Sequence, residues 1–140
     1  MSLQESRLAL DVVRRYFDAI ARMDAAACAA AFAPDGAMHT PCLPPPYPRT
    51  VQGRDGIEQV FTFLFTQVFK SFAWVDLELY ATQTDPSLIF ARTRSSTVIR
   101  DGRLYSNEYA CFSSVKDGTI REHTEFFDTE RAREAFKHLA

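Results

Sequence analysis

Cysteine and histidine are scarce in this sequence, and neither occurs at the spacing of a familiar kind of site. The cysteines are odd in number and far apart, without a CxxC pair, and the histidines are dispersed, without HxxxH spacing or a nearby acidic cluster. A disulfide framework or a zinc site needs regular, close spacing. The sequence therefore predicts no metal site, and we expect the cysteines to be small buried residues. The residues are Cys28, Cys42 and Cys111, and His39, His123 and His138.

Clusters of positive charge and long apolar runs are also missing. The 16 basic and 18 acidic residues are scattered along the chain, which leaves no basic stripe for nucleic acid or an anionic membrane. The apolar stretches are far shorter than a membrane span. The first ten residues, MSLQESRLAL, lack the basic start and apolar run of a signal peptide. We expect a cytoplasmic protein that binds neither nucleic acid nor membrane.

Aromatic residues, in contrast, are plentiful. The sequence has 12 Phe, 5 Tyr and 1 Trp, and 46% of its residues are hydrophobic, which excludes intrinsic disorder. Its 140 residues can bury a real core but are too few for two domains. We predict one domain over residues 1–140, with an aromatic core or pocket.

The N-terminal quarter predicts two helices. Apolar residues recur at three- and four-residue steps over residues 5–22, which places Tyr16 on the core side of an amphipathic helix. Asp24 is a suitable N-cap for a second, alanine-rich helix over residues 25–32. The turn signal Pro34-Asp35-Gly36 is expected to end it.

A loop and a third helix follow. Residues 37–40 predict a short strand, and the proline-rich segment 41–50 predicts a stiff extended loop, because each proline fixes its own φ. The sequence GRDG at 53–56 opens a helix over about residues 57–69. That helix is apolar on nearly every side, so we expect it to be buried on more than one face.

From Phe72 onward the hydrophobic period changes to two, which predicts strands. Helices followed by consecutive hairpins predict an α+β fold, in which a curved antiparallel meander carries the helices on its concave face and forms a cone around one pocket. A terminal helix over residues 129–139 has Asp128 as its N-cap. The predicted strands cover residues 72–82, 88–100, 104–115 and 119–127.

The last strand carries the main functional signal. After the tight turn Asp117-Gly118, alternation places Arg121, His123, Glu125 and Phe127 on one face. The other face carries a carboxylate too, so whichever face turns inward takes an ionisable group with it. Such a conflict with simple burial is typical of a functional site.

The order of the elements, together with the segments ALDVVRRYFDAIARMDAAACAAAFAPDGAMHTP, VQGRDGI and SVKDGTIREHTEFFD, resembles the SnoaL-like branch of the nuclear-transport-factor-2-like superfamily. The C-terminal part is most similar to phenazine-biosynthesis A/B proteins, where segments similar to Ser106–Tyr109, Asp117–Ile120 and Thr124–Phe126 follow one another. This resemblance implies the cone-shaped fold and places Glu125 on the family's acid/base glutamate. The third helix lacks the histidine that those proteins have there.

The N-terminal half is also similar to steroid-isomerase relatives. There the resemblance matches Tyr16 to a tyrosine that donates a hydrogen bond to an oxyanion, whereas the positions of two catalytic carboxyls fall on Thr40 and Ala110. It also implies which residues of the last two strands face the pocket. These are His123, Glu125 and Phe127, and Glu108, Ala110 and Phe112.

Three residues are candidates for catalysis. A carboxylate at Glu125 on an apolar inner face can move protons, although it could equally be a solvated strand residue. His123 could hydrogen-bond Glu125 or a substrate, or be a satisfied structural histidine. Tyr16 could donate to a developing enolate, or only pack.

Other side chains are candidates for binding a ligand. Arg92 and Arg94 share a strand face, which fits an outer, solvent or dimer face better than a carboxylate-binding pocket. The apolar candidates belong either to the core or to a pocket wall. The predicted ligand-binding residues are Glu108, Phe112, Phe127, Phe61, Phe65, Trp74 and His39.

The resemblance supplies the reaction class: it implies a cofactor-free acid/base enzyme, an isomerase, cyclase or dehydratase, acting on a cyclic or aromatic metabolite of polyketide or phenazine type. The alternative is a non-catalytic ligand-binding or structural dimer module of the same fold. In either case we expect a homodimer that pairs through the convex face of the sheet.

Overall fold

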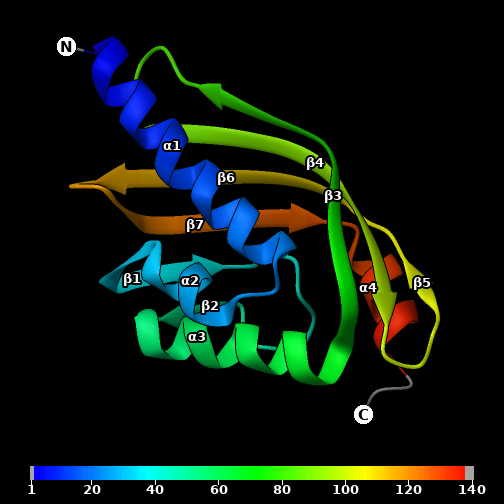
Figure 1. The fold of residues 1–140 in the computed structure, drawn as a ribbon. Helices are drawn as coiled ribbons and strands as arrows, with labels where there is room; N and C mark the ends of the chain where they lie inside the picture. The colour runs from blue at the N-terminus through cyan, green and yellow to red at the C-terminus, as the bar shows by residue number, and fades with distance from the viewer. Residues whose placement is uncertain (1, 138–140) are drawn as a thin grey trace.

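The sheet that dominates the computed structural model curls around a layer of helices (Figure 1). The structure describes residues 2–137, so the predictions for positions 138 and 139 lie outside the described residues. The elements are α1 (Ser2–Ala21), α2 (Ala25–Ala30), β1 (Phe32–His39), β2 (Thr50–Gln52), α3 (Arg54–Phe63), the π-helix η1 (Leu64–Val68), β3 (Phe69–Ala81), β4 (Leu88–Ile99), β5 (Leu104–Tyr105), β6 (Glu108–Lys116), β7 (Thr119–Phe127) and α4 (Thr129–Phe136).

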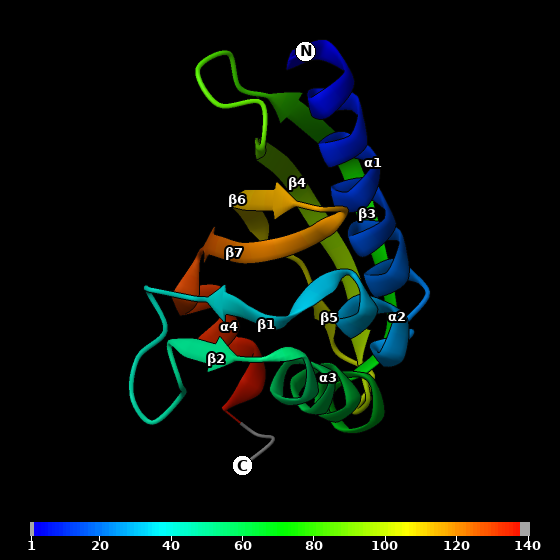
Figure 2. The same cartoon turned by 90° about the vertical axis from the view of Figure 1, so that its left-hand side faces the viewer.

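The strands pair in the order β2-β1-β7-β6-β4-β3, and β5 pairs with β4. The predicted antiparallel meander is present in β3, β4, β6 and β7. Helices α1, α2 and α3 lie along one side of the curled sheet, and the long strands β3 and β4 bend around the end of the layer (Figure 2). The predicted α+β cone is therefore confirmed.

β1 runs parallel to β7, which makes the sheet mixed rather than purely antiparallel. This strand pair was not predicted, because Pro34-Asp35-Gly36 is typical of a turn. In the structure this tripeptide is an irregularity inside β1, where the register against β7 shifts between Phe32 and Ala37. Gly36 permits the close approach, since a Cβ there would lie 2.9 Å from the carbonyl oxygen of Ile120.

Helix α3 buries one face only, against the prediction of burial on several sides. Ile57 and Phe61 lie in the core, whereas the Phe63 side chain is 57% exposed. The last part of the predicted helix is η1, whose wider turns keep Phe65 and Val68 in the core before β3 begins.

The predicted strand 104–115 is divided into β5 and β6 at Asn107. The side chain of this fully buried residue donates to the Tyr105 hydroxyl at 2.7 Å and to the Asp128 carbonyl at 2.9 Å, and accepts from two backbone N–H groups. Asn107 therefore joins the strand break to the start of α4, where Asp128 is the N-cap as predicted.

Two further expectations can be compared with the structure. Cys28 and Cys111 are buried as predicted, but Cys42 is exposed because it lies in the proline-rich loop. Among the described residues no helix is both long enough and apolar enough to cross a membrane.

Candidate active site

A β-bulge in β7 decides which side chains reach the interior. Val115 pairs with Ile120, but the next pair is Ser114 with Glu122, so Arg121 is an extra residue in the ladder. Arg121 is exposed and forms an ion pair with Asp35 at 3.2 Å, so its predicted place beside His123 is wrong. Beyond the bulge, His123 is fully buried and Glu125 also faces inward.

The same bulge shifts the partner strand by one residue. Ser113, Cys111 and Tyr109 lie opposite His123, Glu125 and Phe127. A hairpin without a bulge would place Phe112 opposite His123. The resemblance implied the same inward face of β6, with Glu108, Ala110 and Phe112. The prediction is wrong: Glu108 and Phe112 lie on the outer face, where Phe112 is 40% exposed, and Ala110 lies there too.

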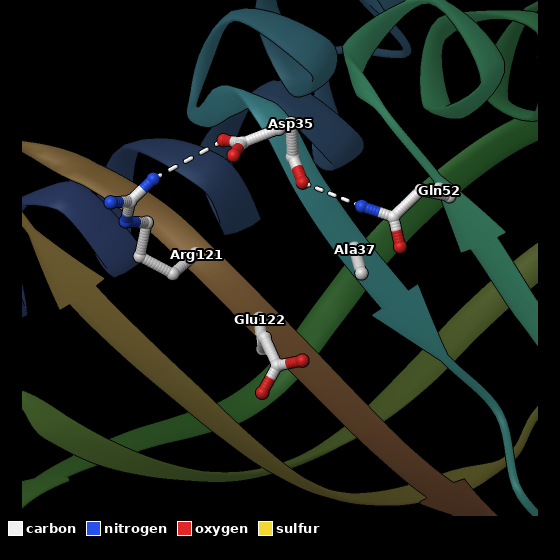
Figure 3. A pocket seen from close by; sticks show the side chains of 5 residues that line it. All are labelled: Asp35, Ala37, Gln52, Arg121 and Glu122. Atoms are coloured by element: carbon white, nitrogen blue, oxygen red, sulfur yellow. Dashed lines mark hydrogen bonds and ion pairs between the residues drawn. The ribbon is translucent and has the colours of Figure 1, made fainter.

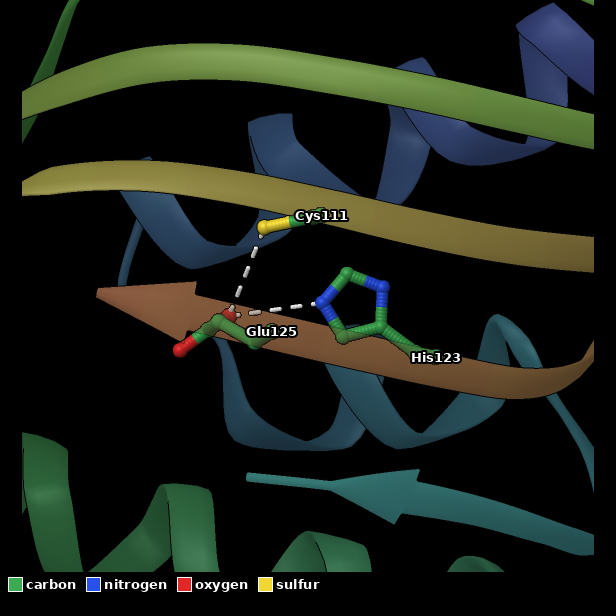
Figure 4. Close-up of side chains that lie close together, drawn as sticks. All are labelled: Cys111, His123 and Glu125. Carbon is green, nitrogen blue, oxygen red and sulfur yellow. Dashed lines mark hydrogen bonds and ion pairs between the residues drawn. The ribbon is translucent and has the colours of Figure 1, made fainter. Parts of the chain in front are cut away.

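Glu125 is held by two neighbours (Figure 4). Its Oε1 lies 3.3 Å from the Nε2 of His123, and the Cys111 thiol donates to the same oxygen over 3.9 Å. The other carboxylate oxygen points away from both residues, and the Glu125 side chain is 22% exposed whereas the ring of His123 is fully buried. One oxygen is thus fixed while the other stays available.

Ser113 completes the arrangement from the other side of the ring. Its Oγ lies 2.7 Å from the Nδ1 of His123, and both residues are buried. An ionised Glu125 can only accept, so Nε2 carries a proton and donates it to the carboxylate. In the neutral ring, Nδ1 then accepts from the Ser113 hydroxyl. The Ser113 hydroxyl, which can donate or accept, therefore completes the two hydrogen bonds that hold the ring beside Glu125.

Tyr16 approaches the same group from α1. Its ring centre lies 5.0 Å from that of His123, and the residue is 1% exposed. Its hydroxyl donates to the Met38 thioether at 3.9 Å, a weak acceptor. Burial first, and then the Glu125 charge, raise the pKa of Tyr16 well above its ordinary value, so the phenol keeps its proton and remains a donor.

The residues that sequence reasoning missed are Tyr109, Cys111 and Ser113. Burial and the nearby Glu125 raise the pKa of the Cys111 thiol, and burial is also the main reason why the pKa of Tyr109 rises. The three lie inward only because of the bulge, and no glycine or proline marks it in the sequence. To find them, one would need to know that Cys111 pairs with Glu125 across the hairpin, which the sequence pattern does not show.

Cys111, His123 and Glu125 are also the residues that could hold a metal ion. Their donor atoms lie within 4.8 Å of one another, and a thiol, an imidazole and a carboxylate are a donor set that suits zinc. The hydrogen bonds from His123 and Cys111 to Glu125 give the same three side chains a role without an ion. The absence of a metal site remains a prediction.

The family model of the SnoaL-like domain matches residues 13–123. This chain belongs to the SnoaL-like family. A comparison with curated proteins found no match.

Solved structures share the SnoaL-like fold at low sequence identity. A candidate isomerase from Bacillus subtilis has a TM-score of 0.84 at 17% identity, covering 95% of each chain. A phenazine biosynthesis-related protein from Pseudomonas aeruginosa has a TM-score of 0.80 at 16% identity, over 96% of this chain and 84% of that one. A candidate polyketide cyclase from Xanthomonas campestris has a TM-score of 0.79 at 18% identity, over 94% and 98%. These similarities establish the fold.

The predicted aromatic ligand-binding residues other than Phe112 are either buried in the core or half-buried. Phe61 and Phe65 are buried core residues, 5% and 6% exposed, and Phe61 contacts Tyr16. Trp74 donates its indole N–H to the Phe17 carbonyl at 2.9 Å and is half-buried. Phe127 is also half-buried and packs against Tyr109.

His39 is the last residue of β1 and lies opposite Thr124 of β7, but it is not hydrogen-bonded to Glu125. It contacts the Thr50 hydroxyl at 3.1 Å and Glu122 at 3.3 Å. Arg92 and Arg94 lie on the outer face of the sheet, paired with Glu78 and Asp76, as the favoured interpretation of the sequence expected.

Two hollows in the surface of this SnoaL-like domain also lie elsewhere. A polar one of about 230 Å³ is lined by outward residues of β1, β2 and β7, among them Asp35, Arg121 and Glu122 (Figure 3). A second, of about 530 Å³, lies on the outer face of α3 and η1 beside Phe63. The chemistry-bearing side chains are gathered instead at the partly exposed edge of Glu125.

Proposed function

We propose that this protein is a small-molecule enzyme that moves protons on an apolar cyclic or aromatic carbonyl compound without a cofactor. The observation that carries the proposal is the arrangement of Glu125. One of its oxygens is held by His123 at 3.3 Å, and the other points away from its two neighbours on a side chain that is 22% exposed. A positioned carboxylate with one available oxygen is suited to general acid/base catalysis.

Glu125 would take a proton from the carbon next to a carbonyl group. The negative charge that develops on the carbonyl oxygen needs a donor, and the Tyr16 hydroxyl is suited to this role because its present acceptor is only a thioether. Return of the proton to another atom of the same substrate gives an isomer. Where the carbon next to the deprotonated one carries a hydroxyl group, return of the proton from Glu125 to that oxygen lets it leave as water and gives a dehydrated product. Attack of the carbanion on a second carbonyl group closes a ring, and the new alkoxide takes back the proton from Glu125.

His123 and Ser113 support this chemistry without touching the substrate carbon. Ser113 fixes the ring of His123, and His123 fixes the carboxylate. Such support keeps the base within the narrow geometry that proton transfer needs. Solved structures of the same fold include proteins described as an isomerase and a polyketide cyclase, and one related to phenazine biosynthesis, which supports proton-transfer chemistry as the reaction class.

Deuterium exchange tests the proposal without knowledge of the substrate. Aromatic ketones with and without a carboxyl group, β-tetralone among them, would be incubated with the protein in D2O, and loss of their α-protons followed by proton NMR. We expect exchange above the buffer rate, and a decrease of roughly 100- to 10,000-fold in Glu125→Gln. Glu122→Gln, an exposed carboxylate of the same strand, is the matched control and should keep the full rate. Equal rates in wild type, Glu125→Gln and buffer would overturn the proposal.

The second candidate is a non-catalytic ligand-binding or dimeric module. One observation favours it: the inward neighbour of Glu125 on β6 is Cys111 rather than a second carboxylate. Retained ligand binding without any proton exchange would support this module over the enzyme.

A further inference from the structure

We propose that the ligand of this site is an uncharged carbonyl compound and that the site rejects carboxylates. This inference rests on the proposed function, because it concerns the same Glu125 edge, and it narrows the class of ligand. The inference distinguishes a neutral ketone or ester from an aromatic acid of similar shape. The apolar surroundings of the site alone do not distinguish these two ligands.

Among the described residues, no lysine or arginine forms a hydrogen bond or ion pair with Glu125, whose partners are Cys111 and His123. The groups around Glu125 are hydroxyls, a thiol, a thioether and one imidazole, contributed by α1, β1, β5, β6 and β7. Burial and Glu125 raise the pKa of Tyr16 and of Cys111, and no cationic side chain acts on either group. The residues are Tyr16, Met38, Tyr105, Tyr109, Cys111 and His123.

The arginines nearest the core are engaged elsewhere. Arg54 donates two hydrogen bonds to the Phe32 carbonyl, and Arg100 donates to the Phe65 carbonyl at 2.6 Å. Both guanidinium groups thus bind backbone oxygens. Arg92 and Arg94 lie on the outer face, each 2.7 Å from a carboxylate partner. These four guanidinium groups thus contact atoms other than those of the Glu125 group, where a carboxylate ligand would need a bidentate partner.

His123 offers no donor to a carboxylate ligand either. Its ring is fully buried between the Ser113 hydroxyl at 2.7 Å and Glu125 at 3.3 Å. Both ring nitrogens are therefore engaged within the protein. A carboxylate ligand beside Glu125 would experience like-charge repulsion without compensation, in surroundings that screen it poorly.

A neutral carbonyl group, in contrast, finds what it needs. The Tyr16 hydroxyl can donate to it by leaving the Met38 thioether, which costs little because that acceptor is weak. The aromatic rings of Trp74, Tyr109 and Phe127 form a half-buried apolar wall beside the same edge. Rejection of the charged analogue is then a built-in part of specificity.

A matched pair of probes tests the inference: 2-acetylnaphthalene and 2-naphthoate, which share one ring system. Binding would be measured by NMR titration at about pH 8, where the acid is ionised. We expect a Kd at least about tenfold lower for the ketone. In Glu125→Gln the ratio of the two Kd values should shrink toward one, because the repelling charge is gone, and in Glu122→Gln it should stay at the wild-type value.

Equal or tighter binding of 2-naphthoate to the wild type would overturn the inference, as would failure of both probes to bind. The two proposals fail separately. Suppose that the wild type binds a carboxylated ketone and exchanges its α-protons, and that Glu125→Gln loses this activity. The acid/base function would then stand, and the inference of a neutral ligand would fail. Selective binding of the neutral probe without any exchange would support the neutral ligand and contradict the acid/base function.

Discussion

Ser113 lies directly opposite His123 in the β6–β7 ladder, with its hydroxyl oxygen 2.7 Å from the Nδ1 of a ring that is wholly buried. A buried imidazole with both nitrogens engaged cannot rotate without breaking a hydrogen bond. Ser113 is therefore a positioning residue for Glu125, although it lies one side chain away from the carboxylate.

Ser113→Ala should release this ring. The Nδ1 atom loses its donor, which costs about 1–3 kcal/mol of stability and lets the ring turn away from Glu125, so that the carboxylate no longer fixes the tautomer. The ring 15N chemical shifts of His123 should show protonated Nε2 in the wild type and a mixture in the variant, with proton-exchange activity decreased about tenfold. Ser113→Thr keeps a hydroxyl and should restore both readouts, whereas Ser114→Ala, opposite Glu122, should change neither. Unchanged His123 shifts in Ser113→Ala would contradict the positioning role.

The stability of the protein should fall steeply in alkali. Burial raises the pKa of Cys28 to about 12 from an ordinary value of 9.0, with the Asp24 charge as the second cause. The unfolded thiol ionises from about pH 9 upward while the folded one keeps its proton, so the contribution is complete below pH 9 and is lost between pH 9 and 12.

Urea unfolding at several pH values measures this loss. Cys28→Ala should decrease the slope of stability against pH in that window by up to about 1.4 kcal/mol per pH unit. Part of the slope should remain in Cys28→Ala, because the pKa values of Tyr16 and Cys111 are raised in the folded protein as well. Cys42→Ala removes an exposed thiol and should reproduce the wild-type slope. A Cys28→Ala slope equal to wild type would show that Cys28 does not lose a buried proton on unfolding.

The outer face of the sheet should pair two copies of the chain. Tyr80, Phe90 and Phe112 form a row across β3, β4 and β6, with ring centres 6.0 and 5.1 Å apart, and Tyr80 and Phe112 are 45% and 40% exposed. A continuous exposed aromatic row marks an interaction surface. Light scattering should give a mass of twice 15.9 kDa for the wild type.

Phe112→Asp should convert this dimer to a monomer by placing a charge in the centre of the row. Phe63→Asp is the matched control, because Phe63 is also an exposed aromatic residue but lies on α3. A wild-type mass of 15.9 kDa at micromolar concentration would rule out pairing through this face.

The part of the site that lies on β7 could be predicted from the sequence. The predicted strand 119–127 has the observed bounds, and the turn before it has the expected left-handed residues, with φ of 53° at Asp117 and 77° at Gly118. Local turn chemistry and period-two alternation were sufficient to place His123 and Glu125 on one face.

The opposite wall could not be predicted because it depends on pairing rather than on local pattern. The bulge at Arg121 has no glycine or proline to mark it, and it exchanges the predicted Ala110 and Phe112 for Cys111 and Ser113. The parallel pairing of β1 with β7 was missed for a related reason, since it joins segments far apart in the chain and contains a tripeptide that locally favours a turn.

The bulge at Arg121 sets the register in which the rest of β7 pairs with β6. If the same residues paired without the bulge, Phe112 would lie opposite His123 and Ala110 opposite Glu125. Deletion of Arg121 would instead leave Ser113 opposite His123 and Cys111 opposite Glu125, and would only make the hairpin regular. The wall of the site therefore depends on how β7 pairs with β6 and not on the Arg121 side chain itself.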